Sequence, residues 1–236
     1  MNGSGKMPNI VLVHAAWADG SCWARVIGPL QSRGLRILAA PIPLTSLSDD
    51  VAALECSLER TDGPIVLVGH AYSGAVTGAS INERVQSLVF ITALTPDEGE
   101  TIGEVFYREK PHSEAPQLAP DKHGFIWMPD DRFGAAFCQN ASAEQAALLA
   151  ATQRPIALEC IQEKAPKPVW KAKPSWYLVA QEDRMINPAT QQFLARRMGA
   201  RIRSEKIDHT PMVTAPETVV EFILQAVTAL AKAPNT

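Results

Sequence analysis

The sequence has no run of lysine or arginine and no long apolar stretch. Acidic residues slightly outnumber lysines and arginines. Over 236 residues, 22 lysines and arginines face 25 acidic residues, which leaves a net charge of -3. Nucleic acids and anionic membranes are bound through concentrated positive charge, which this sequence does not offer. We therefore expect no nucleic acid and no membrane as partner, and a small molecule as substrate or ligand, with a homodimer left open.

Cysteine is scarce, and the cysteines do not have the spacing of a known motif. The four cysteines, Cys22, Cys56, Cys138 and Cys160, form no Cys-x-x-Cys motif and lie near no pair of histidines. This pattern predicts neither a metal site nor a disulfide framework. The expectation is four buried thiols in a reducing compartment.

Targeting signals are also missing from the pattern. The first six residues are polar and predict a flexible start, and the apolar run that follows covers only residues 10–13. A signal peptide has a longer apolar core, and a membrane-spanning helix needs roughly 20 apolar residues. We expect a cytoplasmic protein.

Short β-branched runs alternate with longer helical patterns along most of the chain. This alternation, with 46% hydrophobic residues, predicts one α/β domain whose mostly parallel sheet has helices on both faces. Strands are expected at residues 10–14, 36–40, 65–69, 87–92, 176–180 and 201–207. Helices are expected at 22–33, 48–60, 72–82, 188–198 and 215–232, the last with Thr214 and Glu217 as a capping box.

The alternation stops between residues 97 and 174, where eight of the eighteen prolines fall. A segment of this length is too long for a simple loop, so it predicts a cap inserted into a core of residues 1–96 and 175–236. Helical runs are expected near 131–138 and 143–162. Any one aromatic residue here is best explained by packing within the cap, but together they predict the apolar roof of a pocket, with Trp127 and Met128 as candidate substrate contacts.

Residues 69–74 read Gly-His-Ala-Tyr-Ser-Gly and lie between an apolar strand and an alanine-rich helix. A nucleophile elbow occupies this position in a hydrolase, and its nucleophile would stand where this chain has Ala71. A methyl group cannot attack a substrate. Ser73 lies two residues further on, about 200° round a helix of 3.6 residues per turn, and is not expected to replace it.

Two further candidates follow strands in the chain order expected of a hydrolase. Asp183 comes after the strand at 176–180 and His209 after the strand at 201–207, which predicts an acid and base pair at the carboxyl edge of the sheet. Ala16 and Tyr72 are the candidate backbone donors of an oxyanion hole. His14, expected to brace that loop, is also a candidate substrate contact, as is Trp17.

The segments that carry this pattern together resemble one known family. VLVHAAWADGSCW, APIPLTSLSDDVAAL, GPIVLVGHAYSGAV, ITALTPDEGETI and DHTPMVTAPETVVEFIL, in this order, are similar to the esterase and hydroxynitrile lyase branch of the α/β-hydrolase superfamily. The resemblance implies Asp183 and His209 as acid and base. It also shows two departures, Ala71 where the family has serine and Ser73 where it has glycine. Thr210 stands where the lyases have lysine, so cyanohydrin cleavage is not expected.

Four interpretations of Ala71 remain open. An ordinary serine esterase without its nucleophile would lose about 10⁶ in kcat. A His209–Asp183 enzyme acting on a small apolar carbonyl or ester compound without cofactor or metal is the interpretation we favour; it predicts that His209→Ala abolishes activity and that Ala71→Ser does not raise it. A silent binding protein is the third. The fourth is a deliberate serine-to-alanine replacement, against which the second departure at Ser73 counts.

Overall fold

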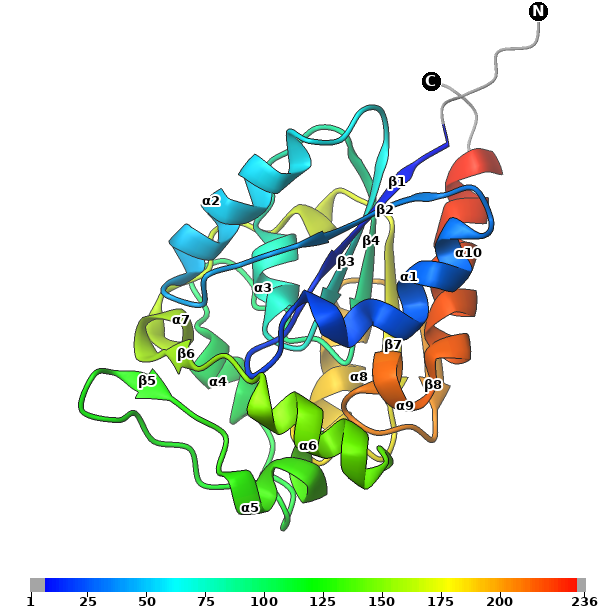
Figure 1. Ribbon diagram of the computed structural model, residues 1–236. Helices are drawn as coiled ribbons and strands as arrows, with labels where there is room; N and C mark the ends of the chain where they lie inside the picture. Colours follow the sequence, from blue (N-terminus) through cyan, green and yellow to red (C-terminus); the bar gives the residue numbers. More distant parts are fainter. Residues whose placement is uncertain (1–6, 233–236) are drawn as a thin grey trace, which may run out of the picture.

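A six-stranded parallel sheet forms the centre of the molecule (Figure 1). The computed structural model describes residues 7–232, so the expectation about the first six residues lies outside the described part. The strand order is β2-β1-β3-β4-β7-β8. The strands are β1 (Asn9–Val13), β2 (Arg36–Ala40), β3 (Ile65–His70), β4 (Val85–Ile91), β7 (Ser175–Ala180) and β8 (Arg201–Glu205). The predicted α/β class with a parallel sheet is confirmed.

Helices cover both faces of this sheet. Helices α1 (Ala24–Gln31) and α10 (Pro216–Lys232) pack together on one face, and α2 (Leu47–Leu58) and α3 (Ser73–Gly78) pack together on the other (Figure 1). Helix α8 (Pro188–Arg197) packs against β7, and the short α9 (Pro211–Thr214) precedes α10. Strands β1 and β3 are buried throughout, because a parallel sheet covered on both faces gives its central strands no solvent side.

Two glycines allow α3 to pack closely against the sheet. A Cβ atom on Gly69 would lie 2.6 Å from the hydroxyl oxygen of Thr77, and one on Gly74 would lie 2.5 Å from the carbonyl oxygen of Leu94. Neither separation is tolerated between real atoms. The pair therefore sets how near the first turn of α3 comes to β3 and to the end of β4.

Several predicted helix ends are wrong for identifiable reasons. Helix α3 covers Ser73–Gly78, not 72–82, and the first turn of the predicted helix 22–33 is a 3₁₀ turn, Gly20–Trp23, initiated by the side chain of Asp19. Thr214 does not act in the predicted capping box. Its hydroxyl donates to the carboxylate of Asp208, 2.5 Å away, which draws it toward the preceding loop.

Most of residues 97–174, here called the cap segment, lies across the carboxyl edge of the sheet, and the last residues of the segment return past the end of α3 to the start of β7 (Figure 1). The predicted helix at 143–162 is wrong as a single element, because Pro155 and a short strand interrupt it. That strand pairs antiparallel with another one, and neither was predicted. The elements are α4 (Ile102–Phe106), β5 (Phe125–Ile126), α5 (Asp130–Arg132), a π-helix (Phe133–Phe137), α6 (Ala143–Ala151), β6 (Ile156–Ala157), α7 (Leu158–Gln162) and a 3₁₀ turn (Val169–Lys171).

Three of the four cysteine side chains are buried. Cys22, Cys138 and Cys160 are buried as expected, but Cys56 is exposed, which corrects the expectation of four buried thiols; within residues 7–232 none of the four forms a disulfide. Among the described helices, none has the length and apolarity needed to cross a bilayer.

Candidate active site

Four non-glycine residues with left-handed backbone mark the carboxyl edge of the sheet. Trp17 (φ 57°), Leu44 (φ 62°), Ala71 (φ 48°) and Thr92 (φ 45°) each follow one of the first four strands of the chain. A side chain disfavours this conformation, so it persists only where the surroundings hold it, and such residues gather at functional sites. These residues indicate a functional site at the edge where the strands end.

Ala71 occupies the sharp turn between β3 and α3. Its carbonyl accepts hydrogen bonds from the N–H groups of Gly74 (3.0 Å) and Leu94 (2.9 Å), and its own N–H donates to the carbonyl of Ile91 (3.2 Å). These bonds hold the left-handed turn against the end of β4. The methyl group of Ala71 lines a cavity in front of the turn.

Ser73 faces away from that cavity. Its hydroxyl oxygen accepts a hydrogen bond from the N–H of His70 (2.8 Å) and lies 2.9 Å from the carbonyl oxygens of both Val13 and His70. The side chain is fully buried and does not line the cavity. Ser73 therefore ties the turn to β1.

His209 and Asp183 are hydrogen-bonded although 26 residues separate them. The Nδ1–H of His209 lies 2.8 Å from Oδ2 of Asp183, and both side chains are almost completely buried. The other carboxylate oxygen of Asp183 accepts from the N–H groups of Met185 (2.7 Å) and Ile186 (2.9 Å). With its proton on Nδ1, the imidazole presents an Nε2 lone pair that has no hydrogen-bond partner among residues 7–232.

A second histidine supports the first. The Nε2–H of His70 donates to the carbonyl oxygen of His209 (2.7 Å), and the two rings lie 4.9 Å apart. Burial holds the pKa of His70 well below its usual range. His70 is therefore a neutral support and places no positive charge beside His209. The sequence pattern gave this residue no role.

Two backbone N–H groups at the cavity wall have no partner within the described residues. They belong to Ala16, in the loop after β1, and to Tyr72, directly after the left-handed Ala71. The Nδ1–H of His14 donates to the carbonyl of Ala15 (2.9 Å), which shares a peptide unit with the N–H of Ala16. Burial lowers the pKa of His14, which keeps the ring neutral for this contact.

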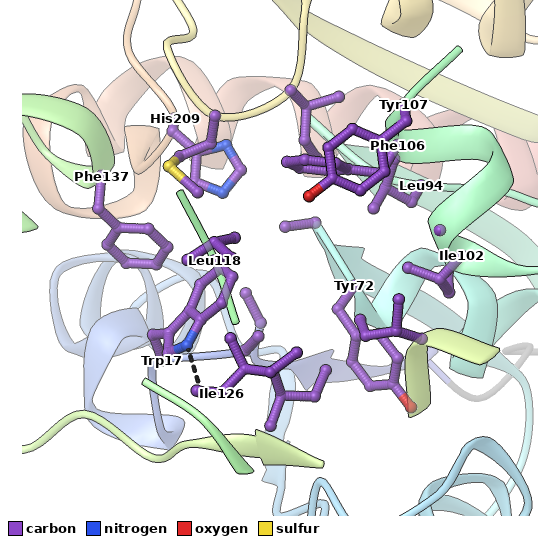
Figure 2. A pocket seen from close by; sticks show the side chains of 18 of the residues that line it. Trp17, Tyr72, Leu94, Ile102, Phe106, Tyr107, Leu118, Ile126, Phe137 and His209 are labelled. Carbon is purple, nitrogen blue, oxygen red and sulfur yellow. Dashed lines mark hydrogen bonds between the residues drawn. The ribbon is translucent and has the colours of Figure 1, made fainter. Parts of the chain in front are cut away.

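The cavity between these groups and the cap segment measures about 220 Å³ (Figure 2). Its wall is almost entirely apolar and includes Leu94, Ile102, Phe106, Leu118, Phe137 and Ile186. Among the residues described, no lysine, arginine, aspartate or glutamate lines it, and His209 is its one ionisable group other than tyrosine. Such a cavity fits an uncharged apolar molecule with one polar group near His209.

Of the four residues predicted as substrate contacts, Trp17 lines the cavity and three do not. His14 is turned into the loop that it braces, Trp127 is 49% exposed on the outer surface, and Met128 is buried behind the wall. Met185 and Ile186 line the cavity and were not predicted. Their position two and three residues after Asp183 is the signal that could have found them.

A buried carboxyl group lies behind the cavity wall. The hydroxyl of Tyr72 donates to Oδ2 of Asp50 (2.6 Å), and the N–H of Leu44 donates to Oδ1 (2.6 Å). Cys160 Sγ lies 3.7 Å from the same carboxylate. Burial raises the pKa of Asp50 to about 6. Because Asp50 engages the hydroxyl of Tyr72, that hydroxyl is not available to a ligand.

Metal ligation finds no support in the side chains. Between residues 7 and 232 no group of three or more histidine, cysteine, aspartate and glutamate side chains is arranged to hold a metal ion.

The sheet order, the left-handed turn after β3 and the acid and histidine on loops after β7 and β8 define the α/β-hydrolase fold. The chain belongs to the Alpha/beta hydrolase family, whose profile matches residues 10–222. The predicted fold class is thereby confirmed.

The chain is also similar to individual proteins of known name. A carbendazim hydrolyzing esterase from Nocardioides sp. (strain SG-4G) is 29% identical over 145 residues, which span 52% of this chain and 60% of that protein. Methylesterase 2 of Arabidopsis thaliana is 24% identical over 258 residues, covering 93% and 95% of the two chains. The crystal structure of polyneuridine aldehyde esterase superposes with a TM-score of 0.82 at 19% identity, covering 93% of this chain and 99% of that one.

Proposed function

We propose that this protein hydrolyses small, uncharged, apolar esters by general-base catalysis, with water as the nucleophile. One observation carries the proposal: the hydrogen-bonded pair of His209 and Asp183 opens onto an apolar cavity, while position 71 beside it has only a methyl group. The similarity to the carbendazim hydrolyzing esterase and to Methylesterase 2 supports ester as the substrate class.

The reaction begins with a water molecule between Nε2 of His209 and the ester carbonyl carbon. Nε2 takes one proton from the water as its oxygen bonds to the carbon, and Asp183 stabilises the imidazolium through Nδ1–H. The carbonyl oxygen becomes an oxyanion, which accepts hydrogen bonds from the N–H groups of Ala16 and Tyr72. The imidazolium then returns its proton to the departing alkoxide, giving an alcohol and a carboxylic acid.

Hydrolysis by an activated water needs no serine at position 71. Ala71 stands at the nucleophile position of the elbow, and Ser73 is committed to hydrogen bonds with β1 and His70. An acyl-enzyme intermediate is therefore not part of the proposed mechanism. The small methyl group leaves the space beside His209 to water.

The wall of the cavity favours one alternative, a binding protein for a small apolar molecule. The polar side-chain groups of Trp17 and Tyr72 are both engaged within the protein, so the wall offers a ligand mainly apolar surface. Tight binding of an apolar ketone or ester with no consumption over hours would support this alternative. Any turnover that depends on His209 would exclude it.

The test is a panel of uncharged aryl and alkyl esters, with carbon–carbon cleavage substrates in parallel, on the native protein, His209→Ala and Ala71→Ser. His209→Ala should lower turnover about 10²- to 10⁴-fold, the usual contribution of a positioned base. Ala71→Ser should not exceed the native rate, because its hydroxyl occupies the space of the attacking water. If native and His209→Ala proteins are equally inert while Ala71→Ser hydrolyses esters, the proposal fails.

A further inference from the structure

Trp17 connects the loop after β1, which contains Ala16, to the cap segment through both of its N–H groups. Its backbone N–H donates to the carbonyl of Arg154 (3.0 Å), and its indole Nε1–H donates to the carbonyl of Ile126 (2.9 Å; Figure 2). Arg154 lies just before β6 and Ile126 in β5, so the two bonds reach two separate stretches of the cap segment. A third stretch meets the indole ring at Phe137, with ring centroids 6.2 Å apart.

The backbone of Trp17 needs this support. Its φ of 57° belongs to the left-handed region, which a residue with a large side chain adopts only when its surroundings compensate. The observed compensation comes from the cap segment, because both N–H donors of Trp17 are directed to it. Without the cap in place, the turn at Trp17 loses the bonds that hold it.

The neighbouring peptide units carry the effect to the site. The carbonyl of Ala15, which shares its peptide unit with the N–H of Ala16, is held by His14 from the core side. The following peptide unit, which ends in the N–H of Trp17, is held by Arg154 from the cap side. The direction of the Ala16 N–H therefore depends on one anchor in the core and one in the cap.

We propose that Trp17 is a positioning residue that couples the cap segment to the oxyanion hole, so that the Ala16 N–H points correctly only while the cap is docked. The inference rests on the proposed function, in which that N–H binds the oxyanion. Trp17 acts on the reaction through Ala16 and forms no hydrogen bond to substrate, since its Nε1–H is already engaged.

The test compares Trp17→Phe with Trp127→Phe. Trp17→Phe keeps an aromatic ring against Phe137 and removes the bond to Ile126. Trp127 is the matched control, because it adjoins Ile126 in sequence but is half exposed and lies outside the cavity wall. Trp17→Phe should lower kcat about tenfold, less than the 10²- to 10³-fold typical when an oxyanion donor is removed outright, with KM changed less than threefold.

A binding measurement separates positioning from packing and does not require turnover. Two ligands with the same apolar arms are titrated by calorimetry: a neutral ketone and a phosphonate monoester anion that imitates the tetrahedral oxyanion. Trp17→Phe should weaken the phosphonate at least fivefold relative to the ketone, and Trp127→Phe should weaken neither. Equal loss of both ligands, or no loss of either, overturns the coupling. If the native protein hydrolyses nothing, the proposed function fails and the ligand ratio still decides the role of Trp17.

Discussion

The side-chain amide of Gln191 donates a 2.8 Å hydrogen bond to Oδ2 of Asp183, the same oxygen that accepts from His209. The amide nitrogen of Gln191 also donates to the carbonyl oxygen of Ile186 (2.9 Å). The amide oxygen of Gln191 accepts a hydrogen bond from the N–H of Ala180 (3.0 Å). Gln191 is fully buried in α8. One amide group thus joins the end of β7, the acid and the loop that follows it, which makes it a support for the orientation of Asp183.

Gln191→Met should therefore damage both stability and turnover. Methionine fills a similar volume but leaves the N–H of Ala180 and the carbonyl of Ile186 without their partner, at about 1–3 kcal/mol for each buried group. We expect the free energy of unfolding to fall by about 2–4 kcal/mol and kcat to fall at least tenfold. Chemical denaturation and ester turnover measure the two effects. Gln192→Met, at the next position of the same helix, is the control: Gln192 is only partly buried and its amide donates one hydrogen bond, to the hydroxyl of Ser204 (2.9 Å). This variant should change stability by about 1 kcal/mol or less.

Ala71→Ser should create a serine that reacts with a fluorophosphonate probe. Residue 71 lines the cavity together with His209, so a hydroxyl there would lie in front of an available base. Intact mass spectrometry should show one adduct on Ala71→Ser, mapped to residue 71, and none on the native protein. An adduct on the native protein at Ser73 would show that its buried hydroxyl leaves its hydrogen bonds, contrary to the arrangement described above.

The sequence predicted the hydrogen-bonded pair of Asp183 and His209 better than the residues that support it, for a physical reason. Asp183 and His209 follow strands of a parallel sheet, and a parallel sheet brings the carboxyl ends of its strands together. Gln191 and His70 support them through contacts between elements far apart in the chain, and no local pattern records such contacts. The cavity wall was predicted as apolar, but the residues that the cap segment contributes to it depend on how that segment folds, which is why Met128 was placed there wrongly. Met185 lies outside the cap segment, in the loop that contains Asp183, and was missed although its position offered a signal.

Asp50→Asn should remove a pH dependence of stability. The carboxyl of Asp50 has a pKa of about 6 in the folded protein and its ordinary value of 3.8 when unfolded. Between these values the folded state holds a proton that the unfolded state has released, so stability is greatest below about pH 4 and falls as the pH rises through 6. A shift of this size corresponds to at most about 3 kcal/mol.

Urea denaturation from pH 4 to 7 measures how the free energy of unfolding changes with pH in the native protein and in Asp50→Asn. The buried His14 and His70, whose lowered pKa values give a slope of opposite sign, are present in both and cancel. Asp49→Asn controls for the loss of one negative charge at the same end of α2. If the native protein loses no more stability than Asp50→Asn between pH 4 and pH 7, the raised pKa of Asp50 is contradicted.

Gly74→Ala should show how far the site depends on the close approach of α3 to β4. The added Cβ would lie 2.5 Å from the carbonyl oxygen of Leu94, a backbone atom that cannot rotate away, and 2.8 Å from the Cβ of Ala93. Overpacking of this kind costs about 1–3 kcal/mol. Since Leu94 N–H also holds the carbonyl of Ala71, relief of the clash must move the elbow, and turnover should fall with stability. Gly134→Ala, whose Cβ meets only an ordinary contact at 3.8 Å, should change neither by much, and equal effects of the two variants would remove this link between packing and catalysis.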